Sequence, residues 1–274
     1  MEVFTALMTI LLVLFLGFIT VVFIFGVILE PAYIMVFNRP IYVHIYLYKK
    51  QLQPSQNNLL RQFSFYRNLS PQKQGYFQHR VHEFISNYQF IGREGLEVTE
   101  EMKVKIAATG VTLTFGMRNY LPAVFNAIIL YPDIFYSPTG GYHKGEFNPS
   151  AKVVVFSWKH FEEGLQFEND NVNLGLHEFA HALHFDSLGR RRIGSSSVIY
   201  IDCYRDVMEY FANPKRRQQI MDANYFREYA YTNQHEFIAV ILEYLFESPK
   251  DFKARLPELY KRVTRMINYR ERWQ

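Results

Sequence analysis

An uncharged run of residues from Val3 to Leu29, rich in Leu, Ile, Val and Phe, is the strongest constraint on the fold of this chain. About 20 apolar residues suffice to cross a hydrocarbon core of about 30 Å, so the run predicts an N-terminal transmembrane helix, residues 1–30. A cleaved signal peptide is the alternative. It is disfavoured because no basic residue precedes the run, the run is long, and no small-x-small cleavage site follows it.

The cations Arg39, Lys49 and Lys50 follow the apolar run, whereas only the amino group precedes it. By the positive-inside rule, this asymmetry predicts a single-pass protein whose C-terminal domain is cytoplasmic. The chain has one cysteine, Cys203, which cannot form an internal disulfide and is compatible with a reducing compartment.

The segment Pro31 to Lys50 is still apolar and aromatic but contains two prolines, Pro31 and Pro40. We expect these prolines to break the helix and the tyrosines and cations to favour an interfacial segment over a second span. A short strand packed on the domain remains open, because apolar residues alternate at Ile41, Val43, Ile45 and Leu47. Gln51 to Asn58 reads as a polar linker. The expected organisation is therefore an anchor (1–30), an interfacial segment with a linker (31–58), and a folded domain (59–274).

The run Asn173 to Asp186, NLGLHEFAHALHFD, contains His177, Glu178 and His181. Its Leu and Ala residues favour a helix, on which histidines four residues apart project from one face and can bind one metal ion. Zinc held by imidazoles lowers the pKa of a bound water towards about 7, and a carboxylate beside it can take the proton. The alternative is a pair of surface histidines, which the apolar flanks disfavour because buried histidines need partners.

A catalytic zinc requires a third protein ligand from another element. The segment Tyr229 to Pro249 predicts a helix that starts after Thr232 or Asn233 and carries His235, Glu236 and Glu243. Spacing alone does not choose among these three. Two further carboxylates, Glu209 and Glu228, are weaker candidates because their neighbours are polar or charged. Other divalent ions can occupy a site of two histidines and one carboxylate.

Four separated segments together resemble one known family. They are GREGLEVTEEMKVKIAATGVTLTFG, YHKGEFNP, HEFAHALHFD and YAYTNQHEFIAVILEYLFESP, within residues 59–252. This combination resembles the Mlc titration factor A family of zinc-dependent peptidases, relatives of the catalytic core of anthrax lethal factor. The resemblance implies an α+β, zincin-like metallopeptidase domain. It also implies that zinc is bound by His177, His181 and Glu236, that Glu178 is the general base, and that Tyr229 hydrogen-bonds the developing oxyanion.

Several residues near these motifs have competing interpretations. Tyr229 could be a packing residue in a chain with 20 tyrosines. Glu243 could orient a histidine ligand or be a surface charge. We expect His184 to pack rather than crowd the metal, His235 to be a neighbour of the site, and Asp186 to end the helix or support a ligand.

The rest of the domain is expected to be mostly helical with a small sheet. We predict helices over Gln62–Tyr88 and Thr99–Thr114 and strands over Ile128–Tyr131 and Lys152–Ser157. Zinc peptidases commonly bind substrate along a sheet edge, so the strand from Val153 or its neighbour should border the cleft. The stretch Tyr136–Pro149 reads as a long loop near it.

The formal net charge is +4, with cations clustered at residues 190–192, 215–217 and 250–272. Such clusters suit solvated helix ends, anionic lipid or an acidic partner, and no nucleic-acid-binding motif accompanies them. The predicted function is a membrane-anchored zinc peptidase that acts on a peptide or protein. The alternative is a zinc-containing protein that sequesters a transcriptional regulator, since the family name records the capture of a repressor.

Overall fold

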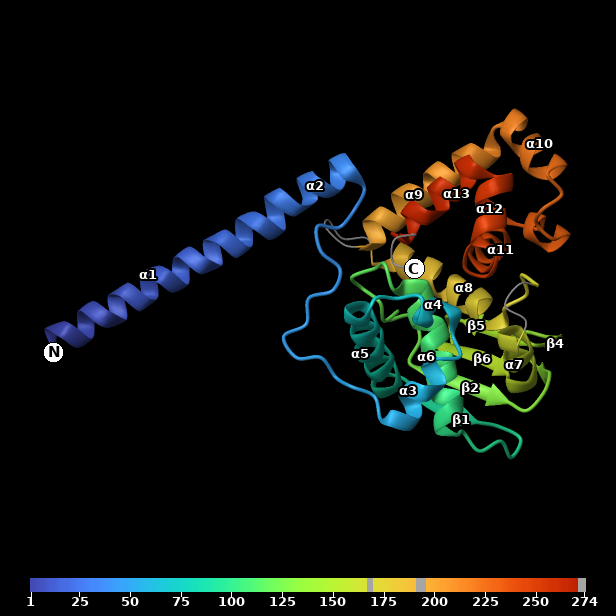
Figure 1. Ribbon diagram of the computed structural model, residues 1–274, viewed down its shortest axis with the longest axis horizontal. Helices are drawn as coiled ribbons and strands as arrows, with labels where there is room; N and C mark the ends of the chain where they lie inside the picture. Colours follow the sequence, from blue (N-terminus) through green and yellow to red (C-terminus); the bar gives the residue numbers. More distant parts are fainter. Residues whose placement is uncertain (167–169, 191–195, 271–274) are drawn as a thin grey trace.

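The computed structural model describes residues 1–166, 170–190 and 196–270 (Figure 1). Its helices are α1 (Glu2–Ile24), η1 (Phe25–Leu29), α2 (Glu30–Phe37), α3 (Pro54–Leu60), α4 (Ser64–Arg67), α5 (Pro71–Asn87), α6 (Glu100–Thr114), α7 (Trp158–Gln166), α8 (Leu174–Gly189), α9 (Ser196–Ala212), α10 (Pro214–Asp222), η2 (Glu228–Tyr231), α11 (Gln234–Glu247), α12 (Pro249–Arg255) and α13 (Pro257–Met266). Its strands are β1 (Gln89–Gly92), β2 (Ala127–Tyr131), β3 (Phe135–Tyr136), β4 (Tyr142–His143), β5 (Gly145–Asn148) and β6 (Val153–Ser157). The described chain is thus mostly helical with a small mixed sheet.

One apolar helix projects from the domain at the N-terminus (Figure 1). It runs without interruption over Glu2–Phe37 and is long and apolar enough to cross a membrane. The expected break at Pro31 is wrong. Proline removes one backbone donor and crowds the carbonyl four residues earlier, and the wider π-helical turn Phe25–Leu29 directly before it can relieve this crowding. The helix ends instead at Asn38, whose φ of 48° is left-handed.

The main sheet has the strand order β1-β2-β6-β5. Strands β1, β2 and β6 are parallel, and β5 pairs antiparallel with β6, with Phe147 opposite Val154, so that β5 forms one edge. The two central strands are buried and apolar, as expected of parallel strands covered by helices, and carry Ile128, Leu130, Val154 and Phe156. Helix α8 packs against β5, β6, α6 and α11, so the run that carries the histidines lies at the centre of the domain.

The predicted strands and the helix from Thr99 are confirmed, and the Thr99 side chain accepts a hydrogen bond from the Met102 amide as the helix cap. Three other expectations are wrong. The helix over Gln62–Tyr88 is two helices, α4 and α5. The stretch 51–58, expected to be a linker, starts α3, in which Gln53 and Gln56 form a reciprocal cap around Pro54 at the first helical position. The loop 136–149 contains β4 and β5.

Candidate metal centre

Helix α8 brings His177 and His181 to one face. The Asn173 side chain caps the helix by accepting from the Leu176 amide, which fixes its first turn. The two histidines follow one turn apart, with their Nε2 atoms 3.1 Å from each other. His177 is buried and His181 is half-buried, as their apolar flanks predict.

Helix α11 supplies the third group. The Asn233 side chain accepts from the amides of His235 and Glu236, so this asparagine, and not Thr232, is the cap. The Glu236 Oε2 atom lies 3.0 Å from His177 Nε2, and its Oε1 atom lies 3.5 Å from His181 Nε2. One ligand atom from each of these three residues lies within 4.8 Å of the other two.

This donor set fits a zinc ion. Zinc takes imidazole nitrogen and carboxylate oxygen at about 2.0–2.2 Å in tetrahedral geometry, which sets neighbouring donors about 3.3 Å apart. The observed separations of 3.0–3.5 Å match that spacing. The Glu236 Oε2 atom is buried and lies 3.0 Å from His177 Nε2, but it makes no hydrogen bond of good geometry among the described residues, as expected of an oxygen aimed at a cation.

The electrostatics of His177 and Glu236 also suit a cation. Burial lowers the pKa of His177, but Glu236 and Glu243 outweigh it and raise the pKa to about 10. Burial raises the pKa of Glu236, but the two imidazoles more than offset this and hold it below its usual range. A positive charge is therefore stabilised among these side chains.

Glu243 lies directly behind His177. This carboxylate is 1% exposed, so its interpretation as a surface charge is wrong. Its Oε1 atom lies 2.7 Å from His177 Nδ1, and its Oε2 atom accepts from the Asn173 amide. Arg227 donates to both oxygens of the same carboxylate. The arrangement fixes which imidazole nitrogen faces the metal position, as supporting carboxylates commonly do.

Glu178 lies on the flank of the histidine face, between α8 and the sheet edge. It is buried, and its Oε2 atom accepts a hydrogen bond of 2.9 Å from the amide of Phe147 on β5. The pKa of Glu178 is raised above its usual value, because the effect of burial outweighs the opposing effects of the two imidazoles and the Phe147 amide. A raised pKa makes a carboxylate a better proton acceptor near neutral pH.

A family comparison agrees with this geometry. The family described as Glucose-regulated metallo-peptidase M90 matches residues 44–268, more than half of the chain. The chain belongs to this family. Among similar proteins are the Mlc titration factors A of Serratia proteamaculans, 25% identical over 203 residues, and of Yersinia pestis, 24% identical over 208 residues. Both alignments cover 67% of this chain, with 75% and 73% of the respective relatives. An uncharacterized protein of Synechocystis is 26% identical over 237 residues, which is 78% of this chain and 84% of that protein. These matches confirm the resemblance to the Mlc titration factor A family.

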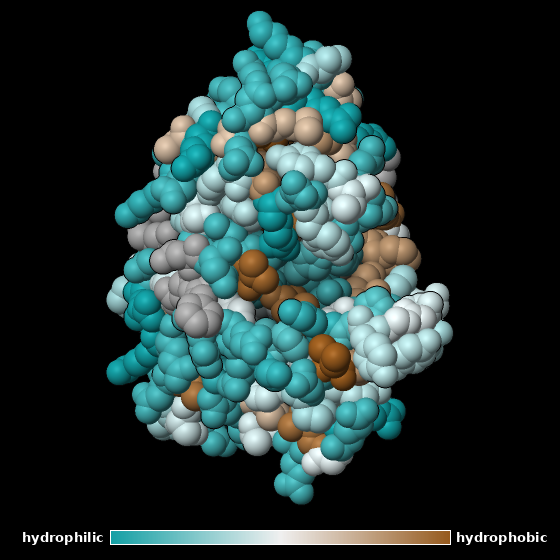
Figure 2. Space-filling view, turned by 90° about the vertical axis from the view of Figure 1, so that its right-hand side faces the viewer, coloured by the Kyte–Doolittle hydropathy of each residue, from teal (hydrophilic) through white to brown (hydrophobic). Residues whose placement is uncertain are grey.

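A pocket of about 620 Å³ lies beside His177 and Glu178 in this M90-family domain. Its walls come from β4, β5, α7, α8 and η2, and include Gly145, Leu174, His177, Glu178 and Tyr229. Figure 2 shows the face of the domain turned away from the N-terminal helix; this face is mostly hydrophilic and is hollowed near its middle. The edge strand β5, the neighbour of β6, borders the pocket as expected.

Tyr229 stands at the mouth of this pocket. Its ring centroid lies 5.9 Å from that of His177, and its side chain is 50% exposed, so it is not a core packing residue. Burial and the nearby charges of Glu236 and Glu178 raise the pKa of Tyr229 to about 12. The phenol therefore keeps its proton at neutral pH and can donate a hydrogen bond.

The remaining histidines lie beside the three-residue group. His184 is buried against the ring of Tyr204, which confirms its packing role. His235 is exposed and contacts His184 at 5.2 Å between ring centroids. Asp186 does not end the helix, because α8 continues to Gly189. Its carboxylate accepts from the Ala123 amide and pairs with Arg190.

Three contributors to this site escaped the sequence analysis: Gly145, the Phe147 amide and Arg227. A Cβ atom at Gly145 would lie 2.9 Å from the Glu178 side chain and 2.7 Å from that of Leu174. Strand β5 is short and polar, so its sequence shows no strand pattern. The pairing of Arg227 with Glu243 joins residues 16 positions apart, so local spacing does not reveal it.

In the hydrolytic role proposed below, Gly145→Ala is expected to reduce peptide hydrolysis by roughly 10- to 100-fold, since displacement of a catalytic group by about 1 Å can have such an effect. The added methyl group would push Glu178 away from its present position. Steady-state hydrolysis of a model peptide by the full chain would measure this loss. Gly189→Ala is the matched control, because it lies on α8 with nothing within 4 Å of its Cβ position. Full activity in Gly145→Ala would contradict the constraint on Glu178.

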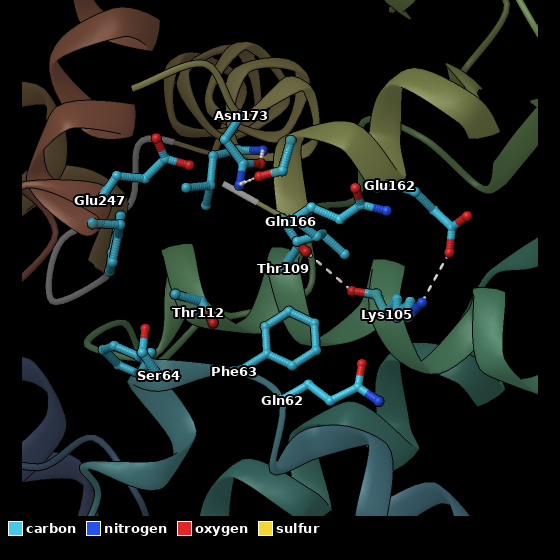
Figure 3. A pocket seen from close by; sticks show the side chains of 15 residues that line it. Gln62, Phe63, Ser64, Lys105, Thr109, Thr112, Glu162, Gln166, Asn173 and Glu247 are labelled. Carbon is cyan, nitrogen blue, oxygen red and sulfur yellow. Dashed lines mark hydrogen bonds and ion pairs between the residues drawn. The ribbon is translucent and has the colours of Figure 1, made fainter. Parts of the chain in front are cut away.

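A second cavity, of about 160 Å³, lies behind the N-terminal end of α8 (Figure 3). Asn173 lines it together with Phe63, Thr112 and Glu247, which come from three other parts of the chain. Asn173 thus borders this cavity and also bonds Glu243 in the metal centre. Burial raises the pKa of Glu247 to about 8.

The free energy of unfolding of Glu247→Gln is expected to increase relative to that of the parent chain as the pH rises. A carboxyl group with a raised folded pKa binds its proton more tightly when folded, so the parent chain loses stability between about pH 4.5 and pH 8. The difference in unfolding free energy between the variant and the parent chain should be smallest near pH 4.5 and become constant above about pH 8. Thermal unfolding midpoints across this range would measure it, with the exposed Glu258→Gln on α13 as the control. Parallel pH profiles for parent and Glu247→Gln would contradict this expectation.

Proposed function

We propose that this chain is a membrane-anchored, zincin-like zinc peptidase in which His177, His181 and Glu236 hold the metal. The convergence of three donor atoms from α8 and α11 at separations near 3.3 Å carries this proposal. A zinc ion at this site would lower the pKa of a bound water and polarise the substrate carbonyl.

Glu178 is proposed as the general base. Its burial and raised pKa favour removal of a proton from the attacking water, and the same carboxyl group can return that proton to the leaving amine. The Phe147 amide holds the carboxylate in place during both transfers. Tyr229, protonated at neutral pH, would donate to the oxygen on which negative charge develops.

The substrate is proposed to lie along β5. This strand is an edge of the sheet, and its Gly145 end lines the pocket beside Glu178. An extended peptide can add to such an edge through backbone hydrogen bonds, which suits a peptidase because these bonds do not depend on side chains.

The anchor is proposed to be α1 with the turn that follows it, and the domain is proposed to be cytoplasmic. Helix α1 has no buried residue, and the cations Arg39, Lys49 and Lys50 follow the apolar run. A reporter fused to the C-terminus that is active only outside the cytoplasm would overturn this orientation.

Glu236→Ala is expected to lose both zinc and hydrolysis. Zinc content of the purified full chain should fall from one ion per chain, with an affinity loss larger than the roughly 10- to 100-fold typical of supporting residues. The matched control is Glu228→Ala, an exposed carboxylate on the adjacent turn η2 that lies outside the three-residue group. Equal zinc content in Glu236→Ala and the parent chain would overturn the third ligand.

A regulator-binding role is the second candidate function. Relatives named Mlc titration factor A align with this chain over about three quarters of their own length. Their name supports a link to the regulator Mlc. In this role the metal site would be slow or structural, and the chain would act by holding its partner. A cellular effect that persists without hydrolysis would favour this role over the peptidase.

A further inference from the structure

In the segment Ile41–Tyr48, which follows the apolar helix, several apolar side chains point away from the domain, whereas in a soluble protein such side chains usually face the core. Three residues of the segment face the domain: Tyr42 lies against Arg118, His44 stacks on Tyr76, and the Tyr46 hydroxyl accepts from Arg80. The outward residues are apolar or aromatic, with exposures of 42% for Ile41, 66% for Ile45, 93% for Leu47 and 87% for Tyr48. Contiguous exposed apolar side chains mark an interaction surface.

This segment is firmly held. The side chain of Arg80 is fully buried and donates to the backbone oxygens of Val43, Thr114 and Phe115 as well as to Tyr46. The Lys50 amide donates to His79, which fixes the far end of the segment. The outward direction of the apolar side chains therefore follows from the contacts of the inward ones.

The segment lies beside the apolar helix, and this position indicates what its outward side chains face. The chain reverses at Asn38 and runs back along the helix, so that the ring of Tyr42 lies 6.5 Å from that of Phe25. The helix rises about 20 Å between Phe25 and Asn38, at 1.5 Å per residue, so the Tyr42 ring lies well back from the end of the helix. Glu30 on the helix pairs with Arg118 of the domain, which fastens the helix at the same place.

The remaining surface of the domain differs from this edge. Figure 1 shows the segment on the edge of the domain nearest to α1, whereas the face in Figure 2 is mostly hydrophilic. Two cations, Lys49 and Lys50, directly follow the apolar residues, and both are exposed. Apolar and aromatic side chains beside lysines are typical of the membrane–water interface.

We propose that Ile41–Lys50 is a second membrane contact, in which Ile45, Leu47 and Tyr48 enter the interfacial layer of the bilayer and Lys49 and Lys50 meet anionic headgroups. The partner is a lipid surface. The contact holds the domain against the bilayer in one orientation, with the face of Figure 2 directed away from the anchor. It depends on the proposed anchor but not on peptidase activity.

Tryptophan probes in the full chain test this contact. Leu47→Trp, Met221→Trp and Leu12→Trp are each reconstituted into vesicles of equal parts phosphatidylglycerol and phosphatidylcholine, with bromine on the upper acyl carbons as the quencher. Leu47 and Met221 are both exposed, but Met221 lies on α10, far from α1 (Figure 1). Leu12 reports insertion of the anchor itself. The native tryptophans give the same background in all three variants.

The expected result is quenching at Leu12 and Leu47 that is several-fold greater than at Met221. Tyr48→Trp should behave as Leu47→Trp does, which guards against a local disturbance by one substitution. Quenching at Leu12 with Leu47 no different from Met221 would overturn the second contact and retain the anchor. Absence of quenching at every position would overturn both the anchor and the contact, and would leave the metal centre unaffected.

Discussion

Glu178→Gln is expected to abolish peptide hydrolysis and leave zinc binding intact. The amide has the same shape and can still accept from Phe147, but it cannot take a proton from water. Loss of a general base commonly costs roughly 10²- to 10⁴-fold in rate. Zinc should remain because Glu178 is not among the three converging ligands. Paired measurements of zinc content and of the rate of hydrolysis on the full chain would check both parts.

The same variant separates the two candidate functions. A cellular effect that disappears with Glu178→Gln requires hydrolysis, whereas one that survives depends on binding alone. Retained hydrolysis in this variant would contradict the assignment of the base. Glu163→Gln serves as the control, because this carboxylate lines the same pocket but is half exposed and lies on α7.

Glu243→Gln is expected to weaken both the metal centre and the fold. The carboxylate contacts His177, Arg227 and the Asn173 amide, and an amide can satisfy only part of this set. Zinc affinity should fall by roughly 10- to 100-fold, as for other residues that orient a histidine ligand. Stability should fall by about 3 kcal/mol, the lower end for a broken buried pair, because Arg227 keeps some contact with solvent.

Zinc titration and denaturant unfolding, each with the full chain, would measure these two effects of Glu243→Gln. Glu258→Gln, an exposed carboxylate on α13, should change neither quantity. Unchanged zinc affinity together with lost stability would show that Glu243 supports only the fold. Lost affinity at full stability would restrict its role to orienting His177.

Local patterns predicted the helices of the metal centre well. The periodicity around His177 and the asparagine before Gln234 determine α8 and α11 through short-range contacts. The choice among His235, Glu236 and Glu243 could not be made in this way. It depends on how α11 crosses α8, which turns Glu236 towards the histidines and Glu243 behind them.

The edge strand and the anchor show where sequence patterns were insufficient. Strand β5 has only four residues and owes its conformation to pairing with β6, so its polar composition resembled a loop. Pro31 lies within a continuous helix, after a widened turn that can relieve its crowding, and the sequence pattern did not predict this turn. The inward direction of Tyr46 depends on Arg80, which lies 34 residues later, and that of Tyr42 depends on the still more distant Arg118.

The bond between Glu30 and Arg118 has a consequence for which substrates can be reached. Together with Arg80, it joins the proposed anchor to the domain without a flexible tether. A domain held in this way cannot swing towards distant proteins, and its cleft stays at one height above the bilayer. In the proposed arrangement, a membrane-bound substrate would be selected by how far its cleavable bond stands from the lipid. Lengthening the stalk of such a substrate would then change its cleavage without any change in the sequence at the bond.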